Sequence, residues 1–373
     1  MGQKKIAIIT YHRSYNYGAA LQSYATVRFF ESIGYSPQII DYYPANLREY
    51  GTYKNSFYDV SNATRPFLVR CLLTLLKTPG YKRLKRAFDP FINRELPLTR
   101  AYYSEEELKR ELPDADIFCT GSDQVWNNYY THEFDDVFFL EFVPENKTKI
   151  SFSSSFGKSE FSEDENNYIK ERLNIYNYIS VRENSGIKIL ENLGYTDCDL
   201  LLDPTLMIQP SVWREFASSA MFDFEYVLVY QLHGDSDTYD RAFEIASRHN
   251  LKIVRIITMP HQRTRGSINV VTPDIRQFVS LFANARIVVT DSFHGTVFSI
   301  INNKKLAITM PKRFGDRITT LANAIGAEEM ILDDIDKWKR LDFDALYVHI
   351  NDRLQKLRQE KTELFVKRMK ELL

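Results

Sequence analysis

Strand-length apolar runs alternate with amphipathic helical stretches along nearly the whole of this 373-residue chain. Valine and isoleucine are frequent in the apolar runs, which is typical of parallel strands that are buried on both faces of a sheet. Two such series are separated near Asp203–Pro204. Domains commonly contain roughly 100–200 residues, so the length also fits two of them. We therefore expect an α/β protein with two Rossmann-like, doubly wound parallel-sheet domains.

The alternation predicts strands at Lys5–Tyr11, Gln38–Tyr42, Asp116–Thr120, Lys149–Ser153, Tyr178–Val181, Tyr226–Leu232, Lys252–Ile257, Ile268–Val271, Arg286–Thr290 and Lys305–Thr309. It predicts helices at Ala19–Ile33, Glu105–Glu111, Glu163–Ile175, Glu183–Leu193, Asp237–His249, Ile275–Ala283, Thr296–Ile301 and Asp316–Ile325. Ligands of doubly wound sheets bind beyond the carboxyl ends of the strands, so the loops that follow strands are the candidates for function.

We place the N-terminal domain at residues 1–205 and the C-terminal domain at 206–340. A basic, amphipathic helical insertion is expected near 63–103. Its part from 65 to 88 holds seven Lys or Arg and no Asp or Glu, with a break expected at Pro79-Gly80. Such a helix either contacts an anionic membrane surface or packs its leucines into the domain with its charges in solvent. The leucines of residues 341–373 recur at near-helical spacing, which predicts a long C-terminal helix.

Composition excludes several classes of protein. Forty-eight Lys and Arg against 49 Asp and Glu give a net charge of −1, so no global basic field exists to gather nucleic acid. Three scattered cysteines predict neither a disulfide framework nor a metal site. The first residues lack the pattern of a signal peptide, and no apolar run is long enough for a transmembrane helix, so we expect neither. We expect a cytoplasmic protein, with peripheral contact at the inner face of the membrane left open; the oligomeric state is not predicted.

Polar residues and glycines follow three strands of the first series. The candidates for binding a substrate here are Asn16, Tyr17, Gly18, Gly121, Ser122, Asp123, Gln124 and Ser155. Free backbone N–H groups at the start of a helix suit an anion or a sugar hydroxyl. The alternative for each is a structural one, namely a polar connecting loop, a capped turn beside a packed tryptophan, or a plain strand end. The dinucleotide pattern GxGxxG and the P-loop pattern are absent, which argues against hydride transfer and P-loop phosphoryl transfer.

The strongest local pattern is the buried strand Arg286–Thr290 followed by Asp291-Ser292-Phe293-His294-Gly295-Thr296. A histidine at a helix N-terminus is favoured in its neutral form and can exchange protons near pH 7. We therefore predict catalytic roles for His294 and Asp291 and substrate contacts from Ser292, Gly295 and Thr296. The arginines at 263 and 265 and the histidines at 12 and 233 also follow strands, and for these we prefer exposed charge or an ordinary loop position.

Taken in order, these segments resemble the polysaccharide pyruvyl transferase family. The resemblance is carried by HRSYNYGAALQSYA at 12–25, TGSDQVWN at 120–127, SFSSSFG at 151–157, SVRENSG at 180–186, LDPTL at 202–206, VVTDSFHGTVFSIINNK at 288–304, and Arg317 before a helix. Residues 220–285 match little beyond the rhythm of strands and helices, and the segment 44–103 is individual to this chain.

The resemblance implies a GT-B-like fold with an interdomain cleft, in which the C-terminal domain holds the donor and the N-terminal domain holds the acceptor. It implies transfer of pyruvate from phosphoenolpyruvate to two hydroxyls of a saccharide, forming a cyclic ketal in surface polysaccharide biosynthesis, with no cofactor and no metal. His294 matches the motif histidine of the family and is expected to be the general acid and base. Arg182 and Arg317 match recurrent arginines that could clamp the anionic donor.

The acceptor is expected against tyrosines of the N-terminal loops, at 42, 43, 50, 53 and 58. Whether it is nucleotide-linked, lipid-linked or polymeric is left open. The resemblance also implies that the C-terminal helix packs back on the N-terminal domain, with a dimer-forming helix as the alternative. Two alternatives for function are a GT-B-type glycosyltransferase that uses a nucleotide sugar and a binding protein without activity. The placed histidine and arginine argue against the binding protein.

Overall fold

The computed structural model describes residues 3–44, 67–128, 133–234, 237–312 and 315–372. Within α3 (Phe67–Glu95), it does not describe the side chains of residues 67, 68 and 70–77. The chain divides into two compact units. Unit 1 contains residues 1–204 and 365–373, and unit 2 contains residues 205–364.

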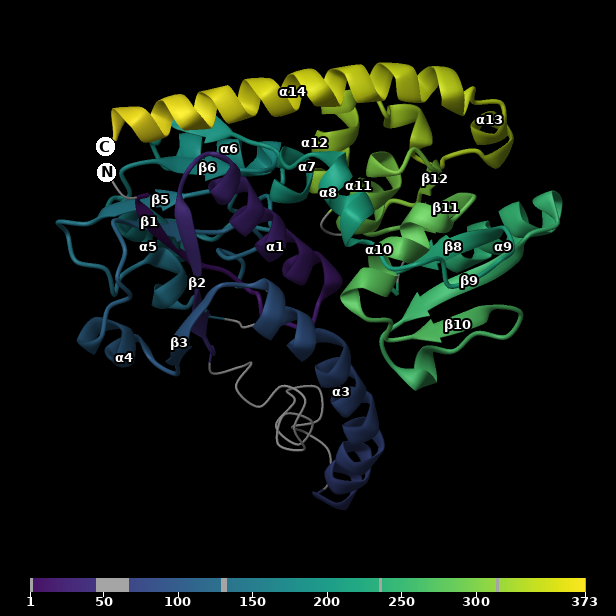
Figure 1. The fold of residues 1–373 in the computed structure, drawn as a ribbon, viewed down its shortest axis with the longest axis horizontal. Helices are drawn as coiled ribbons and strands as arrows, with labels where there is room; N and C mark the ends of the chain where they lie inside the picture. The colour runs from purple at the N-terminus through teal and green to yellow at the C-terminus, as the bar shows by residue number, and fades with distance from the viewer. Residues whose placement is uncertain (1–2, 45–66, 129–132, 235–236, 313–314, 373) are drawn as a thin grey trace. The chain divides into compact units, whose positions relative to one another are not determined.

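Unit 1 is built on a five-stranded parallel sheet in the order β3-β2-β1-β4-β5 (Figure 1). Its strands are β1 (Lys5–Ile9), β2 (Ser36–Tyr42), β3 (Leu98–Tyr102), β4 (Ile117–Thr120) and β5 (Thr148–Ser151). A short parallel pair, β6 (Ile179–Val181) and β7 (Cys198–Leu200), adjoins β5 through single bridges. The helices of this unit are α1 (Tyr17–Ser32), α3, α4 (Glu105–Arg110), α5 (Glu163–Leu173) and α6 (Asn184–Asn192). Aliphatic strand residues and a cluster of aromatic rings around Trp126 form the core.

Unit 2 repeats the same topology with the order β10-β9-β8-β11-β12 (Figure 1). The strands are β8 (Tyr226–Tyr230), β9 (Lys252–Ile257), β10 (Ile268–Val271), β11 (Ile287–Thr290) and β12 (Lys305–Ile308), all parallel. Its helices are α7 (Pro204–Met207), α8 (Pro210–Phe216), α9 (Thr238–His249), α10 (Ile275–Asn284), α11 (Phe293–Ile301), α12 (Asp316–Ile325) and α13 (Ile335–Lys339). Both sheets confirm the predicted pair of Rossmann-like folds.

In each unit the strand order reverses between the first strand and the fourth, at β1/β4 and at β8/β11. Connections from these two strands leave the sheet on opposite sides, so their loops diverge and leave room for a ligand. The loops after β1 and β4 and those after β8 and β11 are therefore the candidate ligand sites of the two units.

Four of these elements, β3, β7, α3 and α11, differ from the sequence-based expectation. Strands β3 and β7 were not predicted, because LTRAY and CDL lack a continuous apolar run. Helix α3 continues through Pro79, where a break was expected, and it tolerates Pro90 as well. A proline within a helix removes one backbone hydrogen bond, and the buried face of residues 81–92 outweighs that loss. Helix α11 begins at Phe293 rather than Thr296, because Ser292 is its N-cap.

The second half of α3 packs an apolar face into unit 1. Tyr81, Leu84, Phe88 and Ile92 are buried, and the basic side chains between them are exposed, namely Lys82, Arg83, Lys85 and Arg86. This is the arrangement of an ordinary amphipathic helix. The leucines at 68, 72, 75 and 76 lie outside the described side chains, so contact of this segment with a membrane stays a prediction. In the part of the chain that the structure describes, we find no helix of the length and apolar character that crossing a bilayer requires.

The C-terminal helix α14 (Phe343–Glu371) belongs to both units (Figure 1). In unit 2, the Tyr347 hydroxyl donates to the backbone of Lys304 at 2.6 Å. In unit 1, the Phe365 ring is fully buried among aromatic rings, the nearest being Phe152 at 4.9 Å between ring centroids. Arg368 pairs with Asp199 at 2.9 Å near the end of the helix. The apolar stripe of this helix is therefore used within the chain.

Candidate functional site

The loop that follows β11 in unit 2 is held by its first residue, Asp291. This carboxylate is fully buried, and its two oxygens accept the backbone N–H groups of Leu232 and His233 at 2.7 and 2.9 Å. Leu232 and His233 belong to the loop after β8, so Asp291 ties together the two loops of the switch point. Hydrogen bonds to an ionised carboxylate are among the stronger ones in proteins, and this pair fixes the spacing of the two loops.

The turn into α11 requires a glycine. The Ser292 hydroxyl caps the helix by accepting the Gly295 N–H at 3.2 Å, and its own N–H donates to Thr290 Oγ1 at 3.1 Å. A Cβ added at Gly295 would lie 2.3 Å from Thr290 Oγ1, and Thr290 is fully buried, so it has no room to move away. This close packing of helix on strand places His294 in the first turn of α11, at the carboxyl edge of the sheet.

His294 and Arg317 both lie near the ring of Phe293. The His294 side chain is almost entirely buried, and its ring centroid is 5.1 Å from that of Phe293. The Arg317 guanidinium carbon lies 5.5 Å from the centroid of the same Phe293 ring. The structure therefore brings the predicted proton donor and the predicted anion clamp to one place in unit 2. Sequence analysis missed Phe293, although it stands directly before His294.

The loop that follows β4 in unit 1 is equally constrained. Gly121 has φ of +107°, and a Cβ there would lie 2.5 Å from Ser154 Oγ and 2.7 Å from the Phe152 carbonyl oxygen. The Ser122 hydroxyl donates to the Ser153 carbonyl at 2.7 Å. Asp123 is in the left-handed region, with φ of 79°. This loop thus lies against the residues that follow β5.

Arg182, which follows β6, is a buried residue that forms an ion pair with the loop after β4. Its side chain has no exposed area, and it pairs with Asp203 at 2.5 Å and with Asp123 at 2.9 Å. Glu183 lies 3.9 Å away. Burial alone would lower the pKa of Arg182, but these three carboxylates outweigh it and raise that pKa above its ordinary value. The guanidinium therefore serves the protein's own carboxylates, which leaves Arg317 as the better candidate for clamping an anionic donor.

The loop after β1 holds the remaining candidates of unit 1. Asn16 is exposed and caps α1 by accepting the Ala19 N–H at 3.3 Å. Tyr17 and Gly18 are buried in the first turn of that helix, and the Tyr17 ring packs on Phe88. Asn16 therefore has a structural role as a helix cap and Tyr17 has one in packing. Both roles agree with the alternative interpretation of this segment as a polar connecting loop.

Two other candidates of unit 1, Gln124 and Ser155, have equally local contacts. Gln124 accepts from the Asn127 amide at 2.5 Å, and the Ser155 hydroxyl accepts the Gly157 N–H at 3.2 Å. Thr296 is fully buried, and its hydroxyl has no hydrogen-bond partner among the described residues. Arg263 and Arg265 are exposed, which agrees with the preferred interpretation of these two arginines as solvent-exposed charge.

A buried cluster around Asp41 was missed by sequence analysis. The His12 ring places Nδ1 3.1 Å from the Thr10 carbonyl and Nε2 3.0 Å from Asp41 Oδ1. Arg13 binds both oxygens of the same carboxylate. Burial alone would raise the pKa of Asp41, but the bonds from His12 and Arg13 outweigh it and hold that pKa below its usual value. Because the His12 side chain is fully buried, it supports the loop after β1 and does not reach a ligand.

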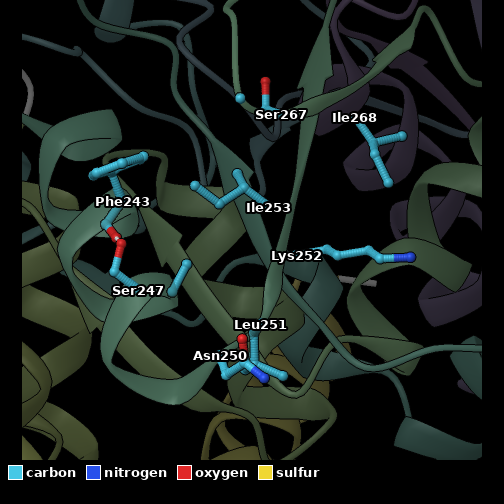
Figure 2. Close-up of a pocket in the computed structure, with 10 residues that line it drawn as sticks. Phe243, Ser247, Asn250, Leu251, Lys252, Ile253, Ser267 and Ile268 are labelled. Carbon is cyan, nitrogen blue, oxygen red and sulfur yellow. Dashed lines mark hydrogen bonds between the residues drawn. The ribbon is translucent and has the colours of Figure 1, made fainter.

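Unit 2 has an open pocket of about 500 Å³ away from these loops. Figure 2 shows Phe243 and Ser247 on α9 and Ile253 on β9 around it. Lys252 and Ile268, the first residues of β9 and β10, also line it, so it lies at the amino ends of these strands. Lys252 is its only charged lining residue, which gives the pocket little means of acid–base chemistry.

The family model described as polysaccharide pyruvyl transferase matches residues 16–308. The match runs from the first turn of α1 to the end of β12, so it includes the loops after β4, β6 and β11. No curated protein matches the chain.

Two solved structures share the fold. A putative UDP-N-acetylglucosamine 2-epimerase from Listeria monocytogenes is 10% identical, with a TM-score of 0.51 over 94% of this chain and 91% of that one. The S. aureus MnaA protein, solved with UDP, is 11% identical, with a TM-score of 0.52 over 93% and 91%. At such identities the likeness shows the fold alone, and it confirms the predicted GT-B-like pair of Rossmann-like domains.

Proposed function

The chain belongs to the polysaccharide pyruvyl transferase family, and we propose that it transfers pyruvate from phosphoenolpyruvate to two hydroxyls of a saccharide. The product is a cyclic ketal, and the acceptor is a unit of a surface polysaccharide. The observation that supports this proposal is that His294, within the matched segment, and Arg317, just after it, both lie near the Phe293 ring at the carboxyl edge of unit 2.

The reaction needs a group that moves protons and cations that hold the donor. Protonation of the methylene carbon of phosphoenolpyruvate makes the neighbouring carbon electrophilic. One sugar hydroxyl adds to that carbon and loses its proton. The bond from the carbon to the phosphate oxygen then breaks, and the second hydroxyl adds and loses its proton. One of the two hydroxyl protons replaces the proton given to the methylene, and the other leaves with the phosphate. The steps as written use no redox cofactor.

We assign the proton transfers at the donor to the His294 imidazole, which is placed and shielded by the first turn of α11. Arg317 supplies a fork of N–H donors suited to a phosphate or carboxylate. Asp291 is a positioning residue, because both of its oxygens already hold backbone N–H groups. Arg182 has the same role in unit 1, where it orders the loop after β4.

The acceptor is proposed to contact tyrosines at the carboxyl edge of unit 1. Tyr43, directly after β2, stacks on Tyr103, directly after β3, with 5.2 Å between their ring centroids. Tyr103 is 48% exposed, so one aromatic surface is open to a sugar ring. The tyrosines at 50, 53 and 58, which the sequence analysis also suggested, lie outside the described residues.

Incubating the purified protein with saccharide acceptors and either phosphoenolpyruvate or nucleotide sugars tests the function. With phosphoenolpyruvate as the donor, and not with a nucleotide sugar, we expect release of phosphate and a gain in the mass of the acceptor that fits a pyruvyl ketal. Release of a nucleoside diphosphate with transfer of a sugar would instead identify a glycosyltransferase. Comparing cell-surface glycans with and without the protein by mass spectrometry would then locate the ketal.

Replacing Arg317 by lysine should weaken donor use more than acceptor use. Lysine keeps the charge but loses the bidentate fork, so the apparent KM for phosphoenolpyruvate should rise about tenfold. The KM for the acceptor should stay close to that of the parent. Arg265→Lys is the control, because Arg265 is exposed and outside the proposed site. An unchanged KM for phosphoenolpyruvate in Arg317→Lys would remove Arg317 from the donor site.

A further inference from the structure

Arg255 is the fourth residue of β9, inside the otherwise apolar segment KIVRII. It pairs in register with Val229 of the neighbouring β8, one level before Tyr230, the last residue of that strand. Its guanidinium reaches residues beyond the strand ends: Nη1 donates to the Gln262 carbonyl and to the Thr264 hydroxyl, and Nη2 donates to Gln231 Oε1 at 3.3 Å. The cation therefore lies at the carboxyl edge of unit 2.

Every contact of this cation is neutral. Besides the three oxygens just named, its guanidinium carbon lies 5.2 Å from the Tyr239 ring centroid. No carboxylate among the described residues pairs with it, whereas Arg182 and Arg13 each hold an aspartate. Burial lowers the pKa of Arg255 from its ordinary value, and Tyr239 opposes that effect. A half-buried guanidinium stays charged at physiological pH, and a buried charge without a counter-ion is costly.

The hydrogen bonds of Arg255 leave two of its N–H groups for a further acceptor. A guanidinium has five N–H groups, and the hydrogen bonds of Arg255 to Gln262, Thr264 and Gln231 use three of them. The Nε atom is buried and has no partner in the part of the chain that the structure describes. The bond from Nη2 to Gln231 is the longest of the three. Nε and Nη2 together form the kind of fork that binds two oxygens of a carboxylate or a phosphate.

Arg255 is also connected to the switch point of the sheet. The Gln231 amide that accepts from Arg255 donates to the His233 carbonyl at 3.1 Å. The His233 N–H in turn is held by Asp291, three residues before His294. A chain of hydrogen bonds thus runs from β9 across the end of β8 to the loop that carries the proposed proton donor.

We propose that Arg255 is a second oxyanion-binding residue of unit 2, which contacts the phosphate or the carboxylate of the donor. Arg317 and Arg255 would then share the charge of phosphoenolpyruvate. The identity of the donor rests on the proposed function, but the oxyanion site itself rests on the uncompensated cation and on its Nε group, which has no partner among the described residues. Sequence analysis considered the exposed Arg263 and Arg265 of the following loop instead, because Arg255 sits within a strand pattern.

The test uses the full chain and its variants Arg255→Gln, Arg255→Lys and Arg263→Gln. Binding of inorganic phosphate and of phosphoenolpyruvate is measured by calorimetry, and the midpoint of thermal unfolding is measured without ligand. Losing a hydrogen-bonded charge contact should weaken anion binding about 10- to 100-fold in Arg255→Gln. Arg255→Lys, which keeps the charge and should fold even if the glutamine variant does not, should show a smaller loss. Arg263→Gln removes an exposed charge eight residues away and should bind both anions within about twofold of the parent.

The possible outcomes distinguish failure of the oxyanion site from failure of the proposed function. Binding of phosphoenolpyruvate that depends on Arg255 supports both. Binding of phosphate that depends on Arg255, without binding of phosphoenolpyruvate, supports the oxyanion site and contradicts the donor assignment. A lowered unfolding midpoint with unchanged anion affinity in the Arg255 variants would show a loop clamp and overturn the proposal. Absence of any anion binding by the parent would overturn it as well.

Discussion

Replacing His294 by alanine should reduce turnover about 100- to 10,000-fold, the usual loss when a positioned acid–base group is removed. The two polar residues that precede α11 are already engaged, since Ser292 is the helix cap and Asp291 holds two backbone N–H groups. The measurement is steady-state phosphate release from phosphoenolpyruvate with the acceptor at saturation. Because the imidazole reacts with the donor, kcat should fall far more than the affinity for phosphoenolpyruvate.

His249→Ala is the matched control. His249 is exposed at the end of α9, close to the amino end of β9. Its replacement by alanine should therefore leave turnover unchanged. Near-UV circular dichroism checks that the His294 variant keeps its packing beside Phe293. Turnover within about threefold of the parent, in a variant that folds normally, would contradict the catalytic role.

Replacing Arg182 by methionine should destabilise the protein by about 3–5 kcal/mol, because the buried carboxylate of Asp203 loses its counter-charge. The free energy of unfolding, from denaturant titration, is the measurement. Adding Asp203→Asn to this variant removes the unpaired negative charge of Asp203, so the double variant should recover part of the lost free energy of unfolding. Arg28→Met is the control, since its ion pair with Glu31 is exposed and should contribute under about 1 kcal/mol.

This experiment also distinguishes two roles for Arg182. If it clamped the donor, its loss would weaken binding of phosphoenolpyruvate and leave the free energy of unfolding nearly unchanged. The observed pairing with Asp203 and Asp123 predicts the opposite result, a large loss of stability at the loop after β4. Weaker donor binding without a change in unfolding would therefore return Arg182 to the donor site.

Most of the fold could be predicted from the sequence, because its strands are short runs of β-branched residues. YVLVY and IVVT are buried on both faces, and no other element accommodates such runs as well. Strand β3 escaped prediction because LTRAY is half exposed and pairs only at the sheet edge. Its pairing with β2 depends on residues about 60 positions apart, which no local pattern contains.

The candidate site could be predicted only in part. The position of His294 follows from a local rule, since a strand that ends in polar residues and passes into a helix presents them at the edge of a parallel sheet. The partners of the charged groups do not follow from such a rule. Arg182 and Arg317 are alike as matches to a family pattern, yet one is buried against Asp203 and the other lies by the Phe293 ring.

The sequence by itself therefore determined most of the elements of this protein, their parallel arrangement and the loops proposed to carry its chemistry. These properties depend on hydrophobic periodicity and on turn residues, which act over a few positions. Only the tertiary structure decided which charges are neutralised: Asp203 pairs with Arg182 across 21 positions, Asp41 with Arg13 across 28, and Arg255 with no acid among the described residues. A charged side chain looks the same in a sequence whether its partner is an acid, water or a ligand. Its energy is set by burial and by the distance to other charges, and both exist only once the chain has folded.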